Sequence, residues 1–254
     1  MASVLELLIL AGTAILSVRL FASGLYRRYR VFFFYLVFAT LRAVVSTTLD
    51  QSGKAYLHFW VLTEPLEWLF YVLVVLEIFA LVLQDYRGLA TVGRWALITA
   101  VLIALLASGV SLMAPSQSTI QGFLRYYYVA ERAVYFSLVV FLVSILGVLM
   151  QYPITLGRNI IVHSMVFSVY FLGHTVFYLL LSMRGMGSIP MVTYALSAIT
   201  LAAVGAWLVL LNPAGELRQV RLRPAWMPGK EEELVNQLNH LNAALLRATG
   251  NRPK

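Results

Sequence analysis

The sequence contains no cysteine and only three lysines, and charged residues of any kind are scarce. The absence of cysteine excludes disulfides, thiolate catalysis, iron–sulfur clusters and cysteine-bound zinc. Only 12% of the 254 residues are charged, against about 25% in an ordinary soluble domain, whereas 61% are hydrophobic. A soluble chain of this composition would expose large apolar patches and aggregate. The apolar residues must therefore be covered by something other than water.

The hydrophobic residues come in long blocks rather than in alternating stripes. About 20 apolar residues are needed to cross the hydrocarbon core of a bilayer, where a helix satisfies the backbone polar groups. The blocks are too long and too uniform for the strands of a membrane barrel. We therefore expect an all-α, multi-pass bundle of about seven transmembrane helices. The expected spans are 4–22, 30–49, 57–84, 94–113, 121–150, 158–184 and 189–211.

Lysine and arginine are unevenly distributed between the predicted loops. Counted together with the terminal residues of the adjoining spans, the first, third and fifth loops carry six of these residues, whereas the second, fourth and sixth carry two. Basic residues gather on the cytoplasmic side of membrane proteins, so the bias predicts an N-terminus outside and a C-terminus in the cytoplasm. The same rule accounts for the net charge of +8. No basic-aromatic motif accompanies this charge, and we do not expect nucleic-acid binding.

The chain divides into a transmembrane domain over 1–212, a basic linker with proline and glycine over 213–229, and a cytoplasmic helix and tail over 230–254. Four leucines in the last segment are spaced four, three and four residues apart, which forms one apolar seam on a helix. They are Leu234, Leu238, Leu241 and Leu245. The seam predicts either a contact with a second copy or a partner protein, or a helix docked on the membrane surface or on the loops.

Six ionisable residues fall inside the predicted spans at a similar depth. A charge near the bilayer centre costs about 3 kcal/mol or more, so such residues are usually paired, turned to the bundle interior or functional. With the predicted orientation and a rise of about 1.5 Å per residue, all six lie in the outer half of the membrane. They are Arg42, Glu64, Glu67, Glu131, Arg132 and His174. This layer is either a ligand- or ion-binding site or a structural ion-pair network, and both alternatives place the side chains inward.

Two further features lie close to these spans. Pro65 cannot donate to the carbonyl of Val61, which predicts a kink and a carbonyl left free either to coordinate a cation or ligand or simply to mark the kink. A second layer near the inner side contains Glu77 and His163, which are candidates for a proton relay. Arginines close to this layer can reach the interface and need no function.

The lysines and histidines are placed unfavourably for common cofactors. His163 and His174 are eleven residues apart and cannot share a metal ion, and no His pair occurs at i, i+4. A haem between His58 and His174 is conceivable in geometry but is not expected. Retinal requires an intramembrane lysine, whereas every lysine lies outside the spans, which excludes a rhodopsin. No metal or other cofactor is therefore predicted, and no catalytic motif is present.

Four short stretches resemble a family of uncharacterised bacterial multi-span membrane proteins of the acidobacterial type. They are 24–29 (GLYRRY), 63–68 (TEPLEW), 88–95 (GLATVGRW) and 158–164 (RNIIVHS). The resemblance implies a multi-pass protein of the bacterial inner membrane. It brings no activity and no functional residues with it.

Three functions remain open at this point. The first is a non-enzymatic membrane module, either a sensor or an assembly subunit of a larger complex. The second is a transporter or channel for a small solute or ion, which the faint match of 41–44 (LRAV) with 131–134 (ERAV) would suit as an inverted repeat. The third is an intramembrane hydrolase, which requires two or more of Glu64, Glu67, Glu131 and His174 within hydrogen-bond reach around a water-accessible cavity.

Overall fold

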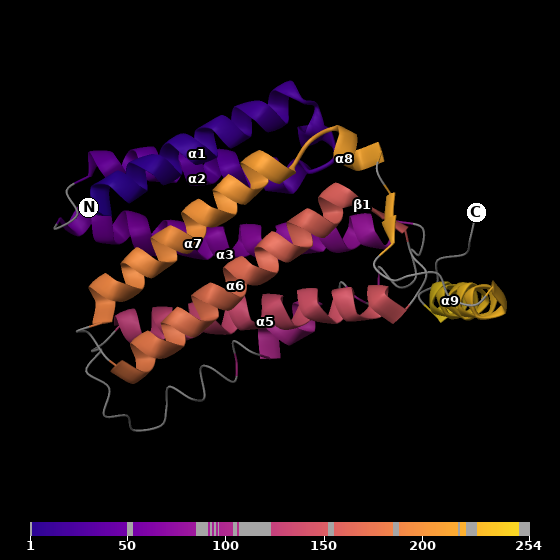
Figure 1. Ribbon diagram of the computed structural model, residues 1–254. Coiled ribbons are helices and arrows are strands. Elements are labelled where there is room, and N and C mark those ends of the chain that lie inside the picture. The colour runs from indigo at the N-terminus through magenta and orange to yellow at the C-terminus, as the bar shows by residue number, and fades with distance from the viewer. Residues whose placement is uncertain are drawn as a thin grey trace.

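The computed structural model describes residues 2–49, 53–84, 123–151, 155–184, 188–217, 219–221 and 228–248, together with 91, 93, 95, 97–103 and 106. Over these residues the chain is almost entirely helical, as its composition predicts (Figure 1). The elements in chain order are α1 (Ala2–Ala22), the 3-10 turn η1 (Leu25–Arg27), α2 (Arg30–Thr48), α3 (Lys54–Val82), α5 (Phe123–Gln151), β1 (Thr155–Gly157), α6 (Arg158–Arg184), α7 (Ile189–Leu210), α8 (Ala214–Leu217), β2 (Gln219–Arg221) and α9 (Pro228–Ala248).

Five of the described helices are long and apolar enough to cross a membrane, judged by length and composition. They are α1, α2, α3, α6 and α7, and each agrees with a predicted span to within a few residues. These helices indicate a membrane protein. The predicted span over 121–150 corresponds to α5, which has 29 residues, as does α3. The predicted span over 94–113 lies mostly outside the described residues, although 97–103 are helical.

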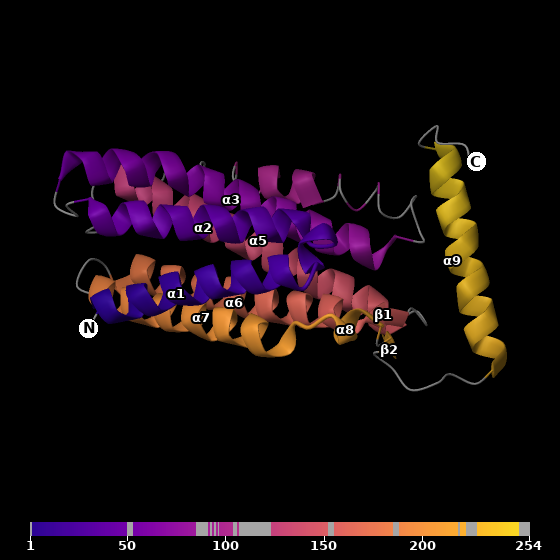
Figure 2. The ribbon, with the colours of Figure 1, turned by 90° about the horizontal axis from the view of Figure 1, so that it is seen from above.

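Among the described residues, six helices pack as a closed ring. In the order α1, α2, α3, α5, α6, α7, each helix contacts the next. The ring closes where α7 contacts α1 (Figures 1 and 2). A Cβ atom on Gly12 of α1 would lie 2.8 Å from Cγ1 of Val204, and one on Gly173 of α6 would lie 2.6 Å from Cδ1 of Ile199. Helices in lipid associate through close packing at such small residues. Glycine at these two positions therefore lets α7 approach α1 and α6 and close the ring.

The ring has a filled half and a hollow half. Toward the end that carries α8, Phe32, Phe167 and Trp207 fill the interior, with ring centroids 4.7 to 5.7 Å apart. All three side chains are buried. Toward the opposite end, the N-terminal half of α3 and the C-terminal half of α6 are lined with polar side chains. An interior cavity opens in this second half.

After α7 the chain turns back onto the bundle. α8 is followed by β2, which pairs antiparallel with β1, the connection between α5 and α6, in the register Leu156 to Val220. The predicted linker over 213–229 thus contains two short ordered elements. A strand of three residues is too short to show an alternating pattern, which explains why it escapes sequence analysis.

α9 lies across the end of the bundle, turned away from the direction of the long helices (Figure 2). Its bounds agree with the predicted cytoplasmic helix. Within the leucine seam, Leu238 is buried, whereas Leu241 is half exposed and Leu245 is partly buried. The side chain of Leu234 lies outside the described residues.

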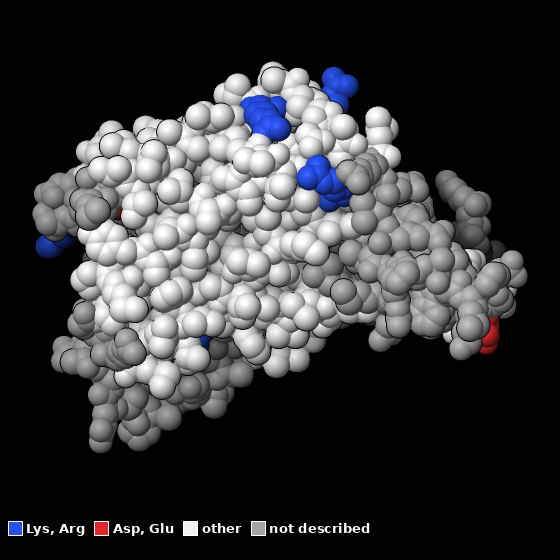
Figure 3. Space-filling model, viewed as in Figure 1, with Lys and Arg blue, Asp and Glu red and all other residues white. Residues whose placement is uncertain are grey.

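The surface shows the same division between the ends and the middle of the bundle. In the view of Figure 3, the blue Lys and Arg side chains lie mainly near the end that carries α8, and the described atoms over the middle are almost all uncharged. Large apolar side chains are exposed on the long helices, among them Val18, Leu62, Val169 and Val209. An apolar belt of this kind suits contact with lipid.

Candidate functional site

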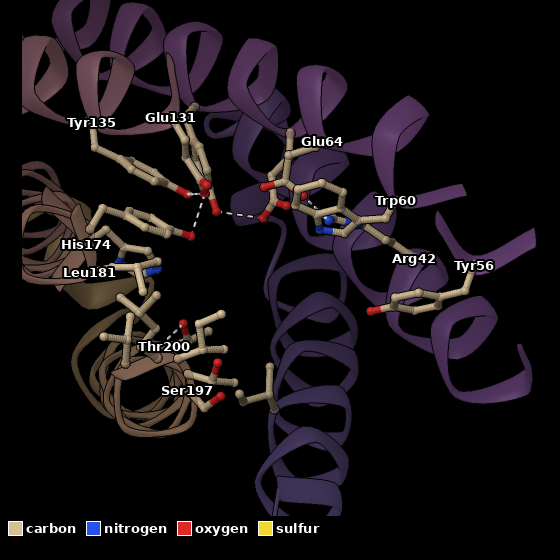
Figure 4. Close-up of a pocket in the computed structure, with 18 of the residues that line it drawn as sticks. Arg42, Tyr56, Trp60, Glu64, Glu131, Tyr135, His174, Leu181, Ser197 and Thr200 are labelled. Atoms are coloured by element: carbon tan, nitrogen blue, oxygen red, sulfur yellow. Dashed lines mark hydrogen bonds and ion pairs between the residues drawn. The ribbon is translucent and has the colours of Figure 1, made fainter. Parts of the chain in front are cut away.

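A cavity of about 730 Å³ opens in the hollow half of the ring. Its volume falls in the range of about 300 to 1,000 Å³ that is usual for small-molecule sites. The polar lining comes from five helices and includes five of the six residues predicted for the outer layer. The charged and aromatic lining residues are Arg42, Lys54, Tyr56, Trp60, Glu64, Glu67, Tyr71, Glu131, Tyr135, Tyr170, His174 and Tyr178. Ser197 and Thr200 of α7 form the opposite wall (Figure 4).

Arg42 holds two carboxylates on one side of the cavity. Its guanidinium forms ion pairs with Glu64 and with Glu67, which are three residues apart on α3 and so share a helix face. The three side chains are between 7% and 17% exposed. A buried charge is tolerated when it is paired and hydrogen-bonded, and this arrangement meets that condition. It also fixes α2 against α3.

Glu131 lies beside this ion-pair cluster. Its Oε1 accepts hydrogen bonds from the hydroxyls of Tyr135, at 3.1 Å, and Tyr178, at 2.8 Å. Its carboxyl group also hydrogen-bonds to that of Glu64 (Figure 4). Two carboxyl groups joined in this way hold a proton between them, because a carboxylate has no donor of its own. Among the described residues, no basic side chain forms an ion pair with Glu131.

Tyrosines continue the polar network toward the filled half. The hydroxyl of Tyr71 donates to Oε1 of Glu67 at 2.6 Å and lies 2.7 Å from the hydroxyl of Tyr170. Because the single proton of Tyr71 is given to Glu67, Tyr170 is the donor to Tyr71. Tyr35 donates to the same oxygen at 3.4 Å. The hydroxyl of Tyr71 is therefore the junction of this network.

His174 and Arg132 occupy different environments. His174 is buried, its Nδ1 lies 2.9 Å from the carbonyl oxygen of Tyr170, and its ring packs against Tyr135 and Tyr170. Arg132 is partly exposed and does not line the cavity. Neighbouring residues on a helix point about 100° apart, and on α5 this step turns Glu131 to the cavity and Arg132 away from it. The LRAV and ERAV stretches therefore place their arginines differently, since Arg42 lines the cavity.

Sequence analysis did not single out the cavity tyrosines. Tyr71 follows Glu67 by four residues and Tyr135 follows Glu131 by four, while Tyr170 and Tyr178 lie four residues on either side of His174. Residues four apart share a helix face. A buried tyrosine also needs a partner for its hydroxyl, unlike a tyrosine at the membrane interface. This spacing is the signal that would have identified them.

The carbonyl freed by Pro65 is taken by a side chain. α3 continues through Pro65, and the hydroxyl of Tyr127 on α5 donates to the carbonyl of Val61 at 2.5 Å. This bond satisfies a backbone group that would otherwise lie unpaired in an apolar setting. The carbonyl of Val61, which the sequence predicts to be left free, thus forms a contact between α3 and α5.

The predicted inner layer is divided between two structural settings. Glu77 accepts hydrogen bonds from the amides of Val31, at 2.8 Å, and Phe32, at 3.1 Å, and so caps the N-terminus of α2. His163 is fully buried between aromatic rings, and neither of its ring nitrogens has a hydrogen-bond partner among the described residues. No hydrogen-bonded path joins the two side chains in the part of the chain that the structure describes.

Two arginines near this end bind the C-terminus of α7. Arg19 of α1 donates to the carbonyl of Leu211 at 2.9 Å, and Arg158 of α6 donates to that of Leu210 at 3.3 Å. The last carbonyls of a helix have no amide partners and carry partial negative charge. Both arginines therefore hold helices together at this end.

Glu216 of α8 joins three segments of the same end. Its Oε1 accepts from the hydroxyl of Tyr29 at 2.6 Å and from the side-chain amide of Asn159 at 2.7 Å, and its Oε2 lies 2.8 Å from Nε of Arg28. Burial and the hydrogen bond to Glu216 raise the pKa of Tyr29 above its ordinary value, so its hydroxyl stays a donor. We call these four residues the Glu216 latch. It ties α8 to α6 and to the α1–α2 turn.

The remaining histidine considered for haem lies away from the cavity. His58 is exposed on the first turns of α3, where Nδ1 lies 2.7 Å from the carbonyl oxygen of Lys54. It does not line the cavity that His174 borders. Within the described ranges, no group of three or more acidic or histidine side chains is placed to hold a metal ion.

Comparison with known proteins adds no relative to this picture: no protein-family model, no curated protein and no solved structure matches the chain. The fold and the site therefore define the class that can be stated, a helical membrane protein with a polar internal cavity. The family resemblance stays a prediction.

Proposed function

We propose that the protein is a non-enzymatic sensor module of the bacterial inner membrane that binds a small organic cation in its cavity. The observation that carries this proposal is the environment of Glu131. Its carboxyl group is buried at the cavity wall, is hydrogen-bonded to Glu64, and has no basic partner among the described residues. A cationic ligand would supply the missing charge.

The charges of the inner cavity support a cation rather than an anion. One guanidinium, that of Arg42, faces both Glu64 and Glu67, so the cluster keeps an excess of one negative charge even when Glu131 holds a proton. Lys54 also lines the cavity, but it is the exposed first residue of α3, where water screens its charge. An anion entering the cavity would have to displace a carboxylate from Arg42.

The aromatic lining supports an organic cation rather than a metal ion. Six rings border the cavity, from Tyr56, Trp60, Tyr71, Tyr135, Tyr170 and Tyr178. Cations over aromatic faces gain about 0.5–2 kcal/mol each, and cages of such rings suit amines and quaternary ammonium groups. The cavity is also larger than a metal ion requires.

The sensor role rests on the two ends of the bundle. With the N-terminus outside, the cavity opens on the outer side, and α8, β2 and α9 lie on the cytoplasmic side. The seven-span count would be reached by adding α5 and the helix around 97–103 to the five helices given above. The leucine seam of α9 would then contact a second copy or a partner subunit, through Leu241 and Leu245.

Ligand binding to purified protein tests the proposal. In a neutral detergent, benzylamine and choline should bind and raise the melting temperature, whereas benzyl alcohol and benzoate should not. Glu131→Gln should weaken benzylamine binding by at least about tenfold, because glutamine keeps the shape of the side chain but cannot release a proton and become the anion that pairs with the cation. Arg132→Gln is the matched control, since Arg132 does not line the cavity. Equal binding by the Glu131→Gln variant, or no binding of either cation, would overturn the proposal.

Transport is a second candidate, and a second cavity favours it. A space of about 350 Å³ shares Arg42, Glu67 and Tyr170 with the main cavity and extends along α1, α2 and α7. Vesicles containing the protein separate the two functions. A transporter would accumulate labelled benzylamine in the vesicles, whereas a sensor would bind it without uptake.

The hydrolase hypothesis requires two or more of its four candidate residues within hydrogen-bond reach around a cavity, and one pair meets this condition. Glu64 and Glu131 are within hydrogen-bond reach of each other at the cavity wall. Glu67 instead accepts from Tyr71, and the ring of His174 lies on the carbonyl of Tyr170. A hydrolase therefore stays a third candidate, whereas the aromatic lining of the cavity favours the binding of a cation.

A further inference from the structure

A separate hollow lies on the outside of the bundle, at the turn between α1 and α2. It has a volume of about 470 Å³. We call it the α1–α2 notch, and its lining residues are Phe21, Tyr26, Arg27, Arg30, Phe33 and Phe34. The notch combines two guanidinium groups with four aromatic rings and contains no acidic residue. It lies at the end of the bundle that carries α8 and shares no residue with the main cavity.

The three arginines of this turn have different environments. Arg28 reaches inward and pairs with Glu216 in the latch. Arg27 and Arg30 are exposed, and neither forms an ion pair with an acid that the structure describes. Nε of Arg27 donates to the hydroxyl of Tyr26 at 3.3 Å, and Nε of Arg30 donates to the carbonyl of Arg27 at 3.2 Å. These bonds orient both guanidiniums and leave their terminal amino groups for a ligand.

The conformation of the turn keeps the two arginines together. Gly24 adopts a left-handed conformation with φ of 73°, which a side chain would disfavour, and η1 follows it directly. The chain then enters α2 at Arg30. The backbone of the turn therefore places two positive charges three residues apart on the same side of the notch.

The aromatic residues continue the notch toward the membrane interior. Tyr26 stacks on Phe21 with ring centroids 5.1 Å apart, and Phe33 lies 5.8 Å from Tyr26. Phe21 and Phe34 are 60% and 61% exposed. Phe34 is four residues into α2, about 6 Å below Arg30 along the helix axis. The charges thus lie at the level of the head groups and the rings at the boundary with the acyl chains.

We propose that the α1–α2 notch binds an anionic phospholipid, with its phosphate on Arg27 and Arg30 and its upper acyl chain on the exposed phenylalanines. Guanidinium groups bind phosphate oxygens in paired hydrogen bonds, which suits the two arginines. A free phosphate would use the arginines but would leave the aromatic rings without a partner. The notch therefore fits a molecule that is negatively charged at one end and apolar at the other.

Native mass spectrometry of the full chain in a neutral detergent tests this site. The probes are phosphatidylglycerol, phosphatidylcholine and inorganic phosphate. We expect one phosphatidylglycerol to be retained in preference to phosphatidylcholine. Arg27→Gln and Arg30→Gln should each weaken its retention about fivefold. Phe34→Ser should weaken the retention of both lipids, because it removes the apolar contact with the acyl chain. Arg247→Gln on α9 removes the same charge at an exposed position and is the matched control.

Three outcomes would overturn the proposal. Displacement of the lipid by millimolar inorganic phosphate, together with no effect of Phe34→Ser, would show a phosphate site instead. An equal loss of phosphatidylglycerol retention in the Arg247→Gln variant would show that the lipid is attracted by the net charge of the protein and not by a site. Retention of no phosphatidylglycerol would show that the notch is empty. The melting temperature of each variant checks its fold. Because Arg27 and Arg30 are exposed, their substitutions should leave the melting temperature unchanged.

Discussion

The hydroxyl of Tyr127 on α5 donates a hydrogen bond to the carbonyl of Val61, the one carbonyl of α3 that Pro65 deprives of its amide donor. A proline in a membrane helix is tolerated when a neighbour satisfies the freed group, and here the neighbour comes from another helix. The bond therefore connects α3 and α5 beside the cavity. It also gives Tyr127 a role that its own sequence position does not reveal.

Tyr127→Phe should lower the free energy of unfolding by about 1–2 kcal/mol, because the carbonyl of Val61 loses its donor inside the bundle. Thermal unfolding in detergent measures the loss. Tyr194→Phe, at a tyrosine of α7 that is 43% exposed, is the control and should have little effect. In a Pro65→Ala background the amide of residue 65 can donate again, so the cost of Tyr127→Phe should largely disappear. An unchanged cost in that background would contradict this account.

Arg42→Gln should be far more destabilising than an ordinary surface substitution. It leaves Glu64 and Glu67 buried without a cation, and breaking a buried ion pair from one side costs about 3–5 kcal/mol. Changing Glu64 and Glu67 to Gln together with Arg42→Gln removes all three charges, and much of the stability should return. The melting temperatures of the single and triple variants test this difference. Equal temperatures would show that charge pairing is not what the cluster contributes.

Glu77→Ala should weaken the start of α2. The amides of Val31 and Phe32 would lose their acceptor, and the loss of a helix cap costs about 0.5–2 kcal/mol. Hydrogen exchange of these two amides should become faster. Glu77→Gln keeps one acceptor oxygen and should retain part of the protection. Similar exchange in both variants would argue against capping by this side chain.

Gly215→Ala should disturb the Glu216 latch. An added Cβ would lie 2.2 Å from Oδ1 of Asn159, which is itself fully buried and bonded to Asn212 and Glu216. We expect a loss of about 1–3 kcal/mol, as in other overpacked sites. Gly205→Ala is the matched control, because nothing lies within 4 Å of its added Cβ and alanine favours the helix. The pair should therefore shift the melting temperature in opposite directions.

His163→Phe should leave stability unchanged or raise it slightly. The ring nitrogens of His163 have no hydrogen-bond partner among the described residues, and replacing an unsatisfied buried polar group by an apolar one of similar shape is nearly neutral or stabilising. Denaturation in detergent measures the change. A loss of several kcal/mol would indicate a polar partner for this ring, as the proton-relay hypothesis requires.

Much of the fold follows from composition and spacing along the chain. Lengths of apolar sequence set the bounds of α1, α2, α3, α6 and α7, because the thickness of the bilayer and the rise of a helix are both constant. The spacing of four leucines likewise located α9. The short β1–β2 ribbon was not predictable, since each strand depends on a partner more than 60 residues away in the sequence, counted from β1 to β2.

The candidate site was predictable in part. Ionisable residues within apolar spans stand out in any sequence, because lipid makes them costly, and five of the six predicted residues line the cavity. The direction in which each side chain points depends on the rotation of its helix. This rotation turns Glu131 toward the cavity and Arg132 away from it. The tyrosine hydroxyls that contact Glu67 and Glu131 are also matters of helix rotation, although their spacing of four residues favours a common face.

The sequence by itself determined that the chain forms long apolar helices, and it located the rare charges that such helices must accommodate. Only the tertiary structure decided that Arg42 pairs with Glu64 and Glu67, that Glu131 meets Glu64 without a basic partner, and that Arg27 and Arg30 turn outward while Arg28 turns to Glu216. The reason is physical: hydrophobic length acts along one segment, whereas ion pairs and hydrogen bonds need atoms from different helices within about 3 Å of each other.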